Sequence, residues 1–315
     1  MTSSLQVVFF GTPEFAVPSL AALLEAGLAV PLIVTQPDRP AGRHADVRPS
    51  AVATLAAARG IPTEKPERVR GDAGLLHRLQ EARPDAIAVV AYGHILPPEI
   101  LRLPRLSCVN VHASLLPKYR GASPVQAAIL AGDSATGVVT MKIEEGLDTG
   151  PLYLERRTAI GEKETAGELS ARLSALGAEL LVETVRGMAA GGLAAHPQEG
   201  EPSFCRPIRR EDGEVDWRMP ATVLSRRLRA YTPWPGLHTF LGSERVKILA
   251  AETASAGSSE APGTLRLEAG QLIAAAGEGS ALRLVRLQRA GRKPVSGAEF
   301  GRALQFPGRF GTAPP

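Results

Sequence analysis

The chain has 315 residues, of which 44% are hydrophobic and 22% are charged. This is the composition of a globular protein, which excludes a fibrous or wholly disordered chain, and the length fits two domains of average size. No apolar run approaches the roughly 20 residues that cross a bilayer, and the first residues form no cationic leader, so we expect a cytoplasmic protein that does not enter a membrane.

The net charge of +4 is unevenly distributed along the chain. Residues 207–315 hold 16 Lys and Arg against 10 Asp and Glu, a net charge of +6, whereas residues 1–206 hold 20 against 22, a net charge of −2. A basic final third predicts contact with a polyanion, and a solvated basic surface without a partner is the alternative.

The cysteines and histidines point to no metal. Cys108 and Cys205 are far apart in sequence, and we expect both to be free, buried thiols. The six histidines and two cysteines show no ligand spacing, so no metal site is predicted.

The first 190 residues alternate between short apolar strand patterns and helical patterns. Strands are predicted at 6–11, 30–35, 86–91, 106–111, 137–143 and 152–158, and helices at 13–26, 50–59, 72–82, 124–131 and 165–188. The strand at 152–158 is expected to pair with the one at 137–143. Strands that alternate with helices predict an α/β domain with a doubly wound, mostly parallel sheet over residues 1–190.

The pattern changes after residue 190. Gly191 and Gly192 and the residues that follow are rich in turn formers and charge, so we interpret 191–206 as a linker. Residues 207–315 form the second predicted domain. It has one helix at 221–230 and short apolar runs at 239–241, 246–250, 263–267, 271–275 and 281–287. This spacing predicts a small closed β-barrel.

The first strand and helix are joined by a turn that argues against a dinucleotide site. Gly11 is a single glycine where the dinucleotide fingerprint needs three, and Pro13 removes an amide that a pyrophosphate would use. A nicotinamide-dependent enzyme is therefore not expected.

Polar side chains gather where a later strand ends. Asn110 and His112 alternate along the strand at 106–111 and so share one face at its carboxyl end, the edge where open α/β sheets bind ligands. Asp148 lies in a glycine-containing loop after the next strand, which we expect to return to this edge and reach His112. Ser114 is a weaker nucleophile candidate because it lacks the sharp strand-to-helix turn that presents a nucleophile. These residues suit a reaction in which the substrate brings its own nucleophile.

The segments at 110–121 and 145–150 resemble the signature of folate-dependent formyltransferases. Four further segments, at 10–16, 36–43, 91–97 and 229–236, are similar to the methionyl-tRNA formyltransferase family, and the likeness extends over nearly the whole chain. The resemblance implies a Rossmann-type domain followed by an OB-like barrel, with 10-formyltetrahydrofolate as co-substrate and initiator methionyl-tRNA as acceptor. A monomer is expected.

The resemblance also implies roles. Asn110 and a protonated His112 would donate hydrogen bonds to the oxyanion that forms on the formyl carbon, and Asp148 would orient His112, favour its charged form and relay a proton. The residues expected to bind the folate are Tyr92, Gly93, Ile95, Leu96, Pro97, Ser114, Leu115, Leu116, Pro117, Glu144, Glu145, Gly146 and Leu147. Those expected to bind tRNA are Arg43, Arg48, Arg226, Arg229, Arg292 and Lys293. His94 is interpreted as a structural residue.

One departure from the family pattern concerns the tRNA loop. After Arg43 the family often continues with glycine and lysines, whereas this chain has residues 44–48 with the sequence HADVR, so we expect a weaker grip on phosphates, shared with Arg48. The alternatives are an amino-sugar nucleotide formyltransferase, a nucleic-acid-binding protein without catalysis, and a hydrolase that releases formate from the folate.

Overall fold

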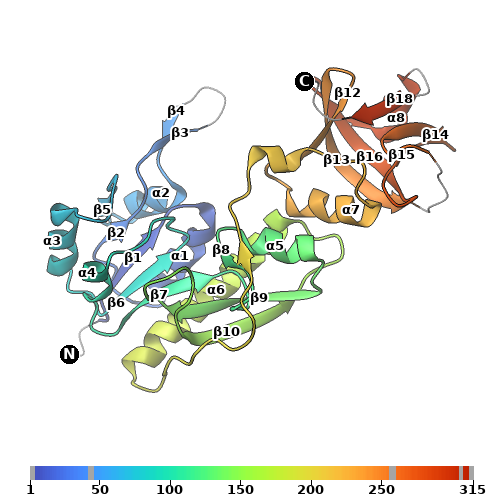
Figure 1. Cartoon of the computed structure of the whole chain (residues 1–315). Coiled ribbons are helices and arrows are strands. Elements are labelled where there is room, and N and C mark those ends of the chain that lie inside the picture. Colours follow the sequence, from blue (N-terminus) through green and yellow to red (C-terminus); the bar gives the residue numbers. More distant parts are fainter. Residues whose placement is uncertain (1–3, 42–45, 255–259, 305–307, 312–315) are drawn as a thin grey trace. The chain divides into compact units, whose positions relative to one another are not determined.

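The computed structural model describes residues 4–41, 46–254, 260–304 and 308–311 (Figure 1). The chain divides into two compact units. Unit 1 consists of Met1–Pro124, Ala135–Ala159 and Ser170–Cys205, and unit 2 consists of Val125–Ser134, Ile160–Leu169 and Arg206–Pro315. Residues 191–205, interpreted from the sequence as linker, are thus part of unit 1.

Unit 1 is built on a seven-stranded sheet with the order β10-β9-β7-β6-β1-β2-β5. The five strands from β7 to β5 in this order run parallel to one another, and β9 pairs antiparallel with both β7 and β10. The bounds are β1 (Val7–Gly11), β2 (Ile33–Val34), β5 (Thr63–Glu64), β6 (Ala86–Val90), β7 (Ser107–His112), β9 (Ala135–Lys142) and β10 (Leu152–Ala159). The predicted mostly parallel sheet is confirmed, as is the pairing of its last two strands.

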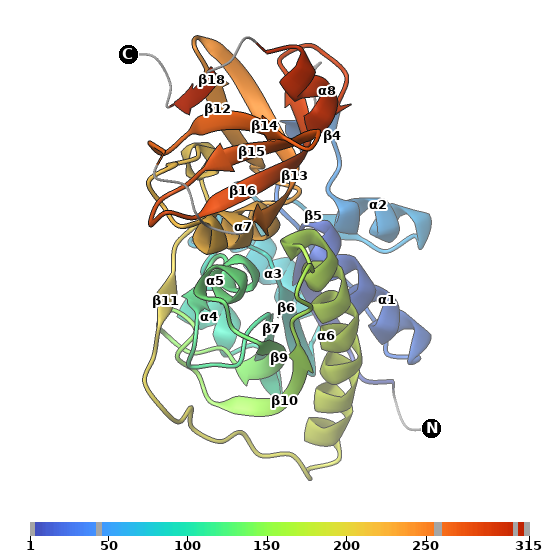
Figure 2. The ribbon, with the colours of Figure 1, turned by 90° about the vertical axis from the view of Figure 1, so that its right-hand side faces the viewer.

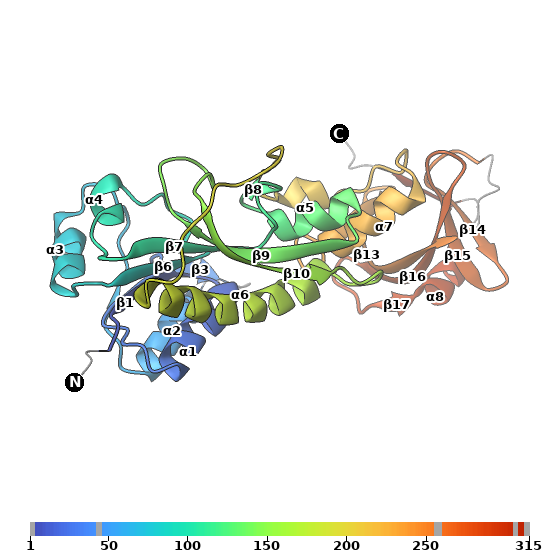
Figure 3. The same cartoon turned by 90° about the horizontal axis from the view of Figure 1, so that it is seen from below.

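Helices cover both faces of this sheet (Figure 3). Their bounds are α1 (Val17–Glu25), α2 (Ala51–Ala58), α3 (Ala73–Glu81), α4 (Pro98–Leu101) and α6 (Ala166–Ala189), and a 3-10 turn η1 (Glu14–Ala16) precedes α1. Helix α5 (Pro124–Ala131) belongs almost entirely to unit 2. Helices α2 and α3 begin where the sequence predicts, because Ser50 and Asp72 accept hydrogen bonds from the backbone N–H groups of Ala53 and Leu75.

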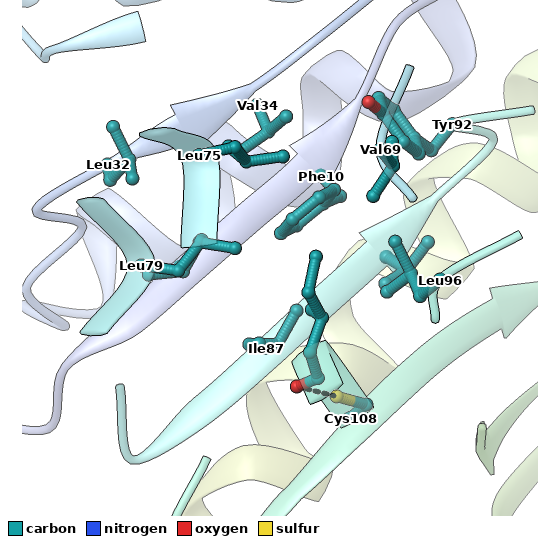
Figure 4. Close-up of a cluster of buried hydrophobic side chains, with 13 residues drawn as sticks. Phe10, Leu32, Val34, Val69, Leu75, Leu79, Ile87, Tyr92, Leu96 and Cys108 are labelled. Carbon is teal, nitrogen blue, oxygen red and sulfur yellow. Dashed lines mark hydrogen bonds between the residues drawn. The ribbon is translucent and has the colours of Figure 1, made fainter. Parts of the chain in front are cut away.

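The core under α3 and α4 fixes the orientation of each strand. Leu75 and Leu79 of α3 pack with Phe10 of β1, Ile87 of β6 and other buried residues into one cluster (Figure 4). Cys108 of β7 belongs to the same cluster, so every second residue of β7 from Cys108 onward faces this side. Val111 faces the opposite side, where Gly177 of α6 lies against it. Asn110 and His112 therefore point to the α3 and α4 side.

Two small strand pairs in unit 1 were not expected from the sequence. β3 (Arg39–Ala41) and β4 (Asp46–Arg48) form an antiparallel ladder, and β8 (Arg120–Gly121) pairs in parallel with β11 (Phe204–Cys205). Both pairs are too short to produce a periodic pattern. The second one joins the predicted linker to the loop that follows β7.

Unit 2 contains a closed antiparallel barrel of six strands, in the order β13-β12-β18-β14-β15-β16, which closes where β16 pairs with β13. The bounds are β12 (Leu237–Leu241), β13 (Glu244–Ala254), β14 (Thr264–Glu268), β15 (Gln271–Ala275), β16 (Ala281–Arg289), β17 (Val295–Ser296) and β18 (Gly308–Gly311), with η2 (Arg210–Gly213), α7 (Ala221–Ala230) and α8 (Gly297–Arg302). The predicted barrel and the helix at 221–230 are confirmed. α8, which packs on β15 and β16 (Figure 2), and β18 were not predicted.

Within the described ranges, no helix combines the length and the apolar character that a membrane crossing requires.

Candidate active site

The site is centred on the carboxyl end of β7. Asn110 is partly exposed there, whereas His112 keeps only 6% of its surface accessible. Among the described residues, the Asn110 side chain makes no hydrogen bond within the protein, so its amide group is available to a ligand. The imidazole of His112 is instead held on both sides by the protein.

The two ring nitrogens of His112 face different partners. Nε2 lies 3.0 Å from the backbone carbonyl oxygen of Tyr119, and Nδ1 lies 3.7 Å from Oδ2 of Asp148. A carbonyl oxygen only accepts hydrogen bonds, so Nε2 carries a proton in this arrangement. Nδ1 and the carboxylate face each other at ion-pair range, slightly beyond hydrogen-bonding distance.

Asp148 reaches His112 because the loop after β9 returns toward the end of β7. Because β9 is antiparallel to β7, its last residue, Lys142, lies beside Val109 rather than at the edge where His112 ends the strand. The loop after β9 must therefore fold back toward the end of β7 to bring the carboxylate to the imidazole. The predicted return of this loop and the predicted proximity of Asp148 to His112 are both observed.

The carboxylate of Asp148 is fixed by a backbone donor. The N–H of Gly121 donates to Oδ2 of Asp148 at 2.8 Å. Gly121 has φ +114°, and a Cβ on it would lie 2.3 Å from the carbonyl oxygen of Cys205, so a larger residue would displace the backbone that carries this donor. Gly150 is equally constrained, because a Cβ there would lie 1.8 Å from the carbonyl oxygen of Lys142.

Strained backbone gathers around this edge. Among the described non-glycine residues, six have positive φ, and three of them border the site: Ala91 at +47°, Tyr119 at +61° and Asp148 at +53°. Such conformations are unfavourable for residues with a Cβ and persist only where surrounding contacts impose them. The site is thus a preorganised part of unit 1.

A segment that the sequence analysis assigned to a linker supplies these contacts; we call residues 196–205 the strap. Nε2 of Gln198 donates to the carbonyl oxygens of Asp148 and Gly150, both at 2.8 Å, and Oε1 of Gln198 accepts from the guanidinium of Arg120 at 2.6 Å and 3.2 Å. No periodicity or motif marks Gln198, so sequence reasoning had no signal with which to find it.

The strap also holds the loop that follows β7. The hydroxyl of Ser203 accepts from the N–H of Tyr119 at 2.9 Å, and the Ser203 carbonyl accepts from the N–H of Arg120 at 2.8 Å. Sγ of Cys205 lies 3.4 Å from the Tyr119 and Arg120 carbonyl oxygens and from the N–H of Ser123. Both cysteines are free thiols, as expected, but Cys205 is only half-buried. Burial raises the pKa of both, that of Cys108 to about 12.

The residues expected to bind folate after β6 separate into core and surface. Tyr92 and Leu96 belong to the core cluster of Figure 4, and burial raises the pKa of Tyr92 to about 12. Pro97 is also buried. Gly93 is exposed, and Ile95, with 83% of its surface accessible, is the most exposed of the large hydrophobic residues described. Only Gly93 and Ile95 of this group are exposed.

The second expected folate group divides in the same way. Ser114 is fully buried and its hydroxyl donates to the Lys118 carbonyl at 2.6 Å, so it is not presented as a nucleophile. Leu116 packs in a core cluster with Val139, Met141 and Leu152, Pro117 is buried, and Leu115 is half-buried. The segment 144–147 is exposed throughout, and Leu147 keeps 57% of its surface accessible. An exposed isoleucine and an exposed leucine thus come from the loops after β6 and β9.

The residues expected to bind tRNA differ in their exposure and in the contacts that they make within the protein. Arg43 lies outside the described residues. Arg226 and Arg229 are half-buried in unit 2 and donate to the carbonyl oxygens of Ala131 and Glu164, and burial lowers the pKa of Arg229. Arg48 is exposed, 3.9 Å from Asp46.

On the barrel, Arg292 and Lys293 are exposed. Arg283 and Arg289, which belong to the basic final third of the chain, are instead paired with Glu252 and Glu244. Across the described residues, no group of three or more His, Cys, Asp or Glu side chains is placed to hold a metal ion.

Comparison with known proteins was consistent along the whole chain. Residues 5–185 match the model of the formyl transferase family, and residues 207–305 match the model of its C-terminal domain. A methionyl-tRNA formyltransferase of Thermodesulfovibrio yellowstonii is 42% identical over 294 residues, covering 93% of this chain and 94% of the relative. One from Methylococcus capsulatus is 43% identical over 310 residues, covering 98% and 100%.

A solved structure of a sugar 3N-formyl transferase, WlaRD, in the presence of dTDP and 5-N-formyl-THF, superposes with a TM-score of 0.65 at 18% identity, covering 92% of this chain and 99% of that one. At that identity the likeness concerns the fold.

Proposed function

The chain belongs to the formyl transferase family, and from this premise we propose that it transfers the formyl group of 10-formyltetrahydrofolate to the α-amino group of methionine on initiator methionyl-tRNA. The observation that carries the proposal is the match of both domains, at 42–43% identity over nearly the full length, to methionyl-tRNA formyltransferases. The free amide of Asn110 beside the His112 and Asp148 pair supplies the chemistry.

The attacking amine needs little activation by the protein. A free α-amino group titrates near pH ~7.7–8.0, so a large fraction is neutral at physiological pH. The amine nitrogen attacks the formyl carbon, the carbonyl becomes an oxyanion, and the bond from that carbon to N10 of the folate then breaks as N10 takes a proton. The main demand on the protein is therefore stabilisation of the oxyanion.

Asn110 is the first donor to that oxyanion. Its amide has no partner within the described protein, so no internal hydrogen bond must break before it donates. His112 is the second donor, and its Nε2–H must exchange the Tyr119 carbonyl for the oxyanion. Asp148 then holds the ring from the Nδ1 side and takes part in moving the amine proton toward N10.

The pteridine and the adjoining ring of the folate need an apolar surface with backbone polar groups near it. Ile95 and Leu147 are exposed apolar side chains in the loops after β6 and β9, and each has an exposed glycine in the same loop, Gly93 and Gly146. We place the folate on these loops. The buried members of the two expected folate groups contribute indirectly, by holding the backbone of their loops in position: Tyr92, Leu96, Ser114 and Leu116.

The nucleic acid is bound mainly through phosphates. Arg48, Arg292 and Lys293 are exposed and suited to this contact, whereas Arg226 and Arg229 must first give up internal partners. Arg43 remains part of the proposal on the basis of the sequence alone. Aromatic residues make up only 4% of the chain, so stacking on bases is secondary.

The test is a direct transfer assay. Labelled 10-formyltetrahydrofolate is mixed with the protein and either methionyl-tRNA or a dTDP-linked amino sugar, and the label is followed into each acceptor. We expect formyl-methionyl-tRNA only. Transfer to the sugar nucleotide alone would replace the proposed acceptor, and release of formate without either acceptor would indicate a hydrolase.

A further inference from the structure

The strap is bonded to both protein partners of His112. It reaches Tyr119, which accepts from Nε2 of the ring, through the hydroxyl of Ser203, and it reaches Asp148, which faces Nδ1, through the amide of Gln198. One short segment, more than 80 residues after β7 in the sequence, therefore sets the position of the groups on either side of the imidazole.

Gln198 uses every part of its side-chain amide. The NH₂ group bridges the carbonyl oxygens of Asp148 and Gly150, and the oxygen accepts two N–H groups of Arg120. Only an amide offers donors and an acceptor at this reach, because a carboxylate cannot donate and an ammonium group cannot accept. The side chain thus joins the two loops that meet at His112.

These loops contain two of the three strained residues that border the site, Tyr119 and Asp148. Asp148 has φ +53°, which must be maintained by its surroundings, and the Gln198 amide bonds to its carbonyl oxygen directly. Arg120 precedes Gly121, whose N–H donates to the Asp148 carboxylate at 2.8 Å. Gln198 therefore fixes both the residue that carries the carboxylate and the residue next to its backbone donor.

We propose that Gln198 is a positioning residue for formyl transfer: it holds Asp148 and the Arg120–Gly121 backbone together so that the carboxylate faces His112. This rests on the proposed function for its kinetic readout. Displacement of a catalytic group by about 1 Å can slow an enzyme by roughly a hundredfold, so loss of the Gln198 bridge should act on the chemical step.

The kinetic experiment compares Gln198→Ala and Gln198→Glu with Glu199→Ala, an exposed neighbour in the same strap. Gln198→Glu keeps an acceptor for Arg120 but turns a carboxylate toward two carbonyl oxygens. We expect kcat to fall roughly tenfold to hundredfold in both Gln198 variants, with KM for each substrate within about twofold, and Glu199→Ala to behave as wild type. Unchanged kcat in both Gln198 variants, or a loss confined to KM, overturns the proposal.

A double-mutant cycle with Asp148→Asn separates positioning from general destabilisation. If Gln198 acts through Asp148, then adding Gln198→Ala to Asp148→Asn lowers kcat little further, because the group being positioned is already altered. If the two losses multiply, Gln198 does not act through Asp148 and the proposal fails.

A measurement without catalysis keeps this test independent of the proposed function. The Gly121 N–H donates to Asp148, so its hydrogen exchange reports whether that contact persists in the native protein. We expect exchange at Gly121 to accelerate roughly tenfold or more in Gln198→Glu and to stay unchanged in Glu199→Ala. Unaltered exchange would refute the positioning role even if wild-type protein formylated no tRNA.

Discussion

Two carboxylates, one in each unit, show how differently the chain uses the same group. Asp212 in unit 2 accepts from the guanidinium of Arg206 and from the N–H of Arg209, and the hydrogen bond from Arg206 is the largest cause that lowers its pKa to about 2. Asp148 in unit 1 has one backbone donor and an imidazole at 3.7 Å, and no arginine of the described ranges forms an ion pair with its carboxylate. The tighter ion pair belongs to Asp212, and the looser one to Asp148, the carboxylate for which we propose a role in the reaction.

The difference has a physical reason. A carboxylate locked by a guanidinium contributes to folding free energy but cannot readily exchange a proton with a neighbour, whereas one held by a single backbone N–H keeps accepting capacity for the imidazole. The strength of an ion pair is therefore a poor guide to the active site, and the strained backbone around Asp148 is a better one.

The largest effect on kcat is expected from a substitution of Asn110, which lies at the end of β7 beside His112. Asn110→Ala should lower kcat roughly 10²–10³-fold, because it removes a proposed oxyanion donor whose amide has no hydrogen-bond partner among the described residues. The thermal midpoint should remain close to that of wild type, since the amide makes no hydrogen bond to the part of the chain that the structure describes. Single-turnover formylation of methionyl-tRNA measures the rate, and a loss of less than about threefold would remove Asn110 from this role.

Asp148→Asn tests directly whether Asp148 differs in role from Asp212. The substitution keeps an acceptor for the Gly121 N–H but removes the charge that faces His112, so we expect kcat to fall roughly tenfold to hundredfold while the protein stays folded. Steady-state kinetics together with thermal unfolding decide this. A variant that loses stability but keeps its rate would show that Asp148 resembles Asp212 after all.

Asp212→Asn should give the reverse outcome. Because the folded-state pKa of Asp212 lies below its unfolded value of 3.8, the stabilisation is present above that value and is lost as the pH falls toward 2. We expect a loss of about 1–2 kcal/mol at pH 7 that shrinks steadily below pH 4, with kcat unchanged. Denaturant unfolding of both proteins between pH 7 and pH 2 is the measurement, and a pH-independent difference would contradict it.

The smallest effect belongs to the exposed cations of the barrel. Replacing Arg292 and Lys293 together with alanine should weaken tRNA binding only a few-fold at physiological salt and reduce the slope of log affinity against log salt by about 2, one for each phosphate contact. The rate at saturating tRNA should not change. A slope equal to that of wild type would place the phosphate contacts elsewhere.

The sequence predicted those parts of the molecule that depend on local pattern. The alternation of strands and helices, the shared face of Asn110 and His112, and the barrel all follow from periodicity within short windows. The direction of β9 and the partners of Gln198 do not, because they depend on contacts between segments distant in sequence. The split of the expected folate residues into buried and exposed likewise required coordinates, since Tyr92 and Ile95 belong to one short motif.

The strap has a further consequence, for association between molecules. β10 is an outer strand of the sheet, and its first residues, Leu152 and Tyr153, are buried and apolar. The backbone of Leu152 exchanges two hydrogen bonds with His196, at 2.7 Å and 2.8 Å, so the strap caps the apolar start of this edge. Further along, the strand carries exposed charges at Glu155 and Arg157, which discourage another strand from pairing there. The strap, which bonds to the loops around His112, thus also helps to protect the sheet from edge-to-edge aggregation.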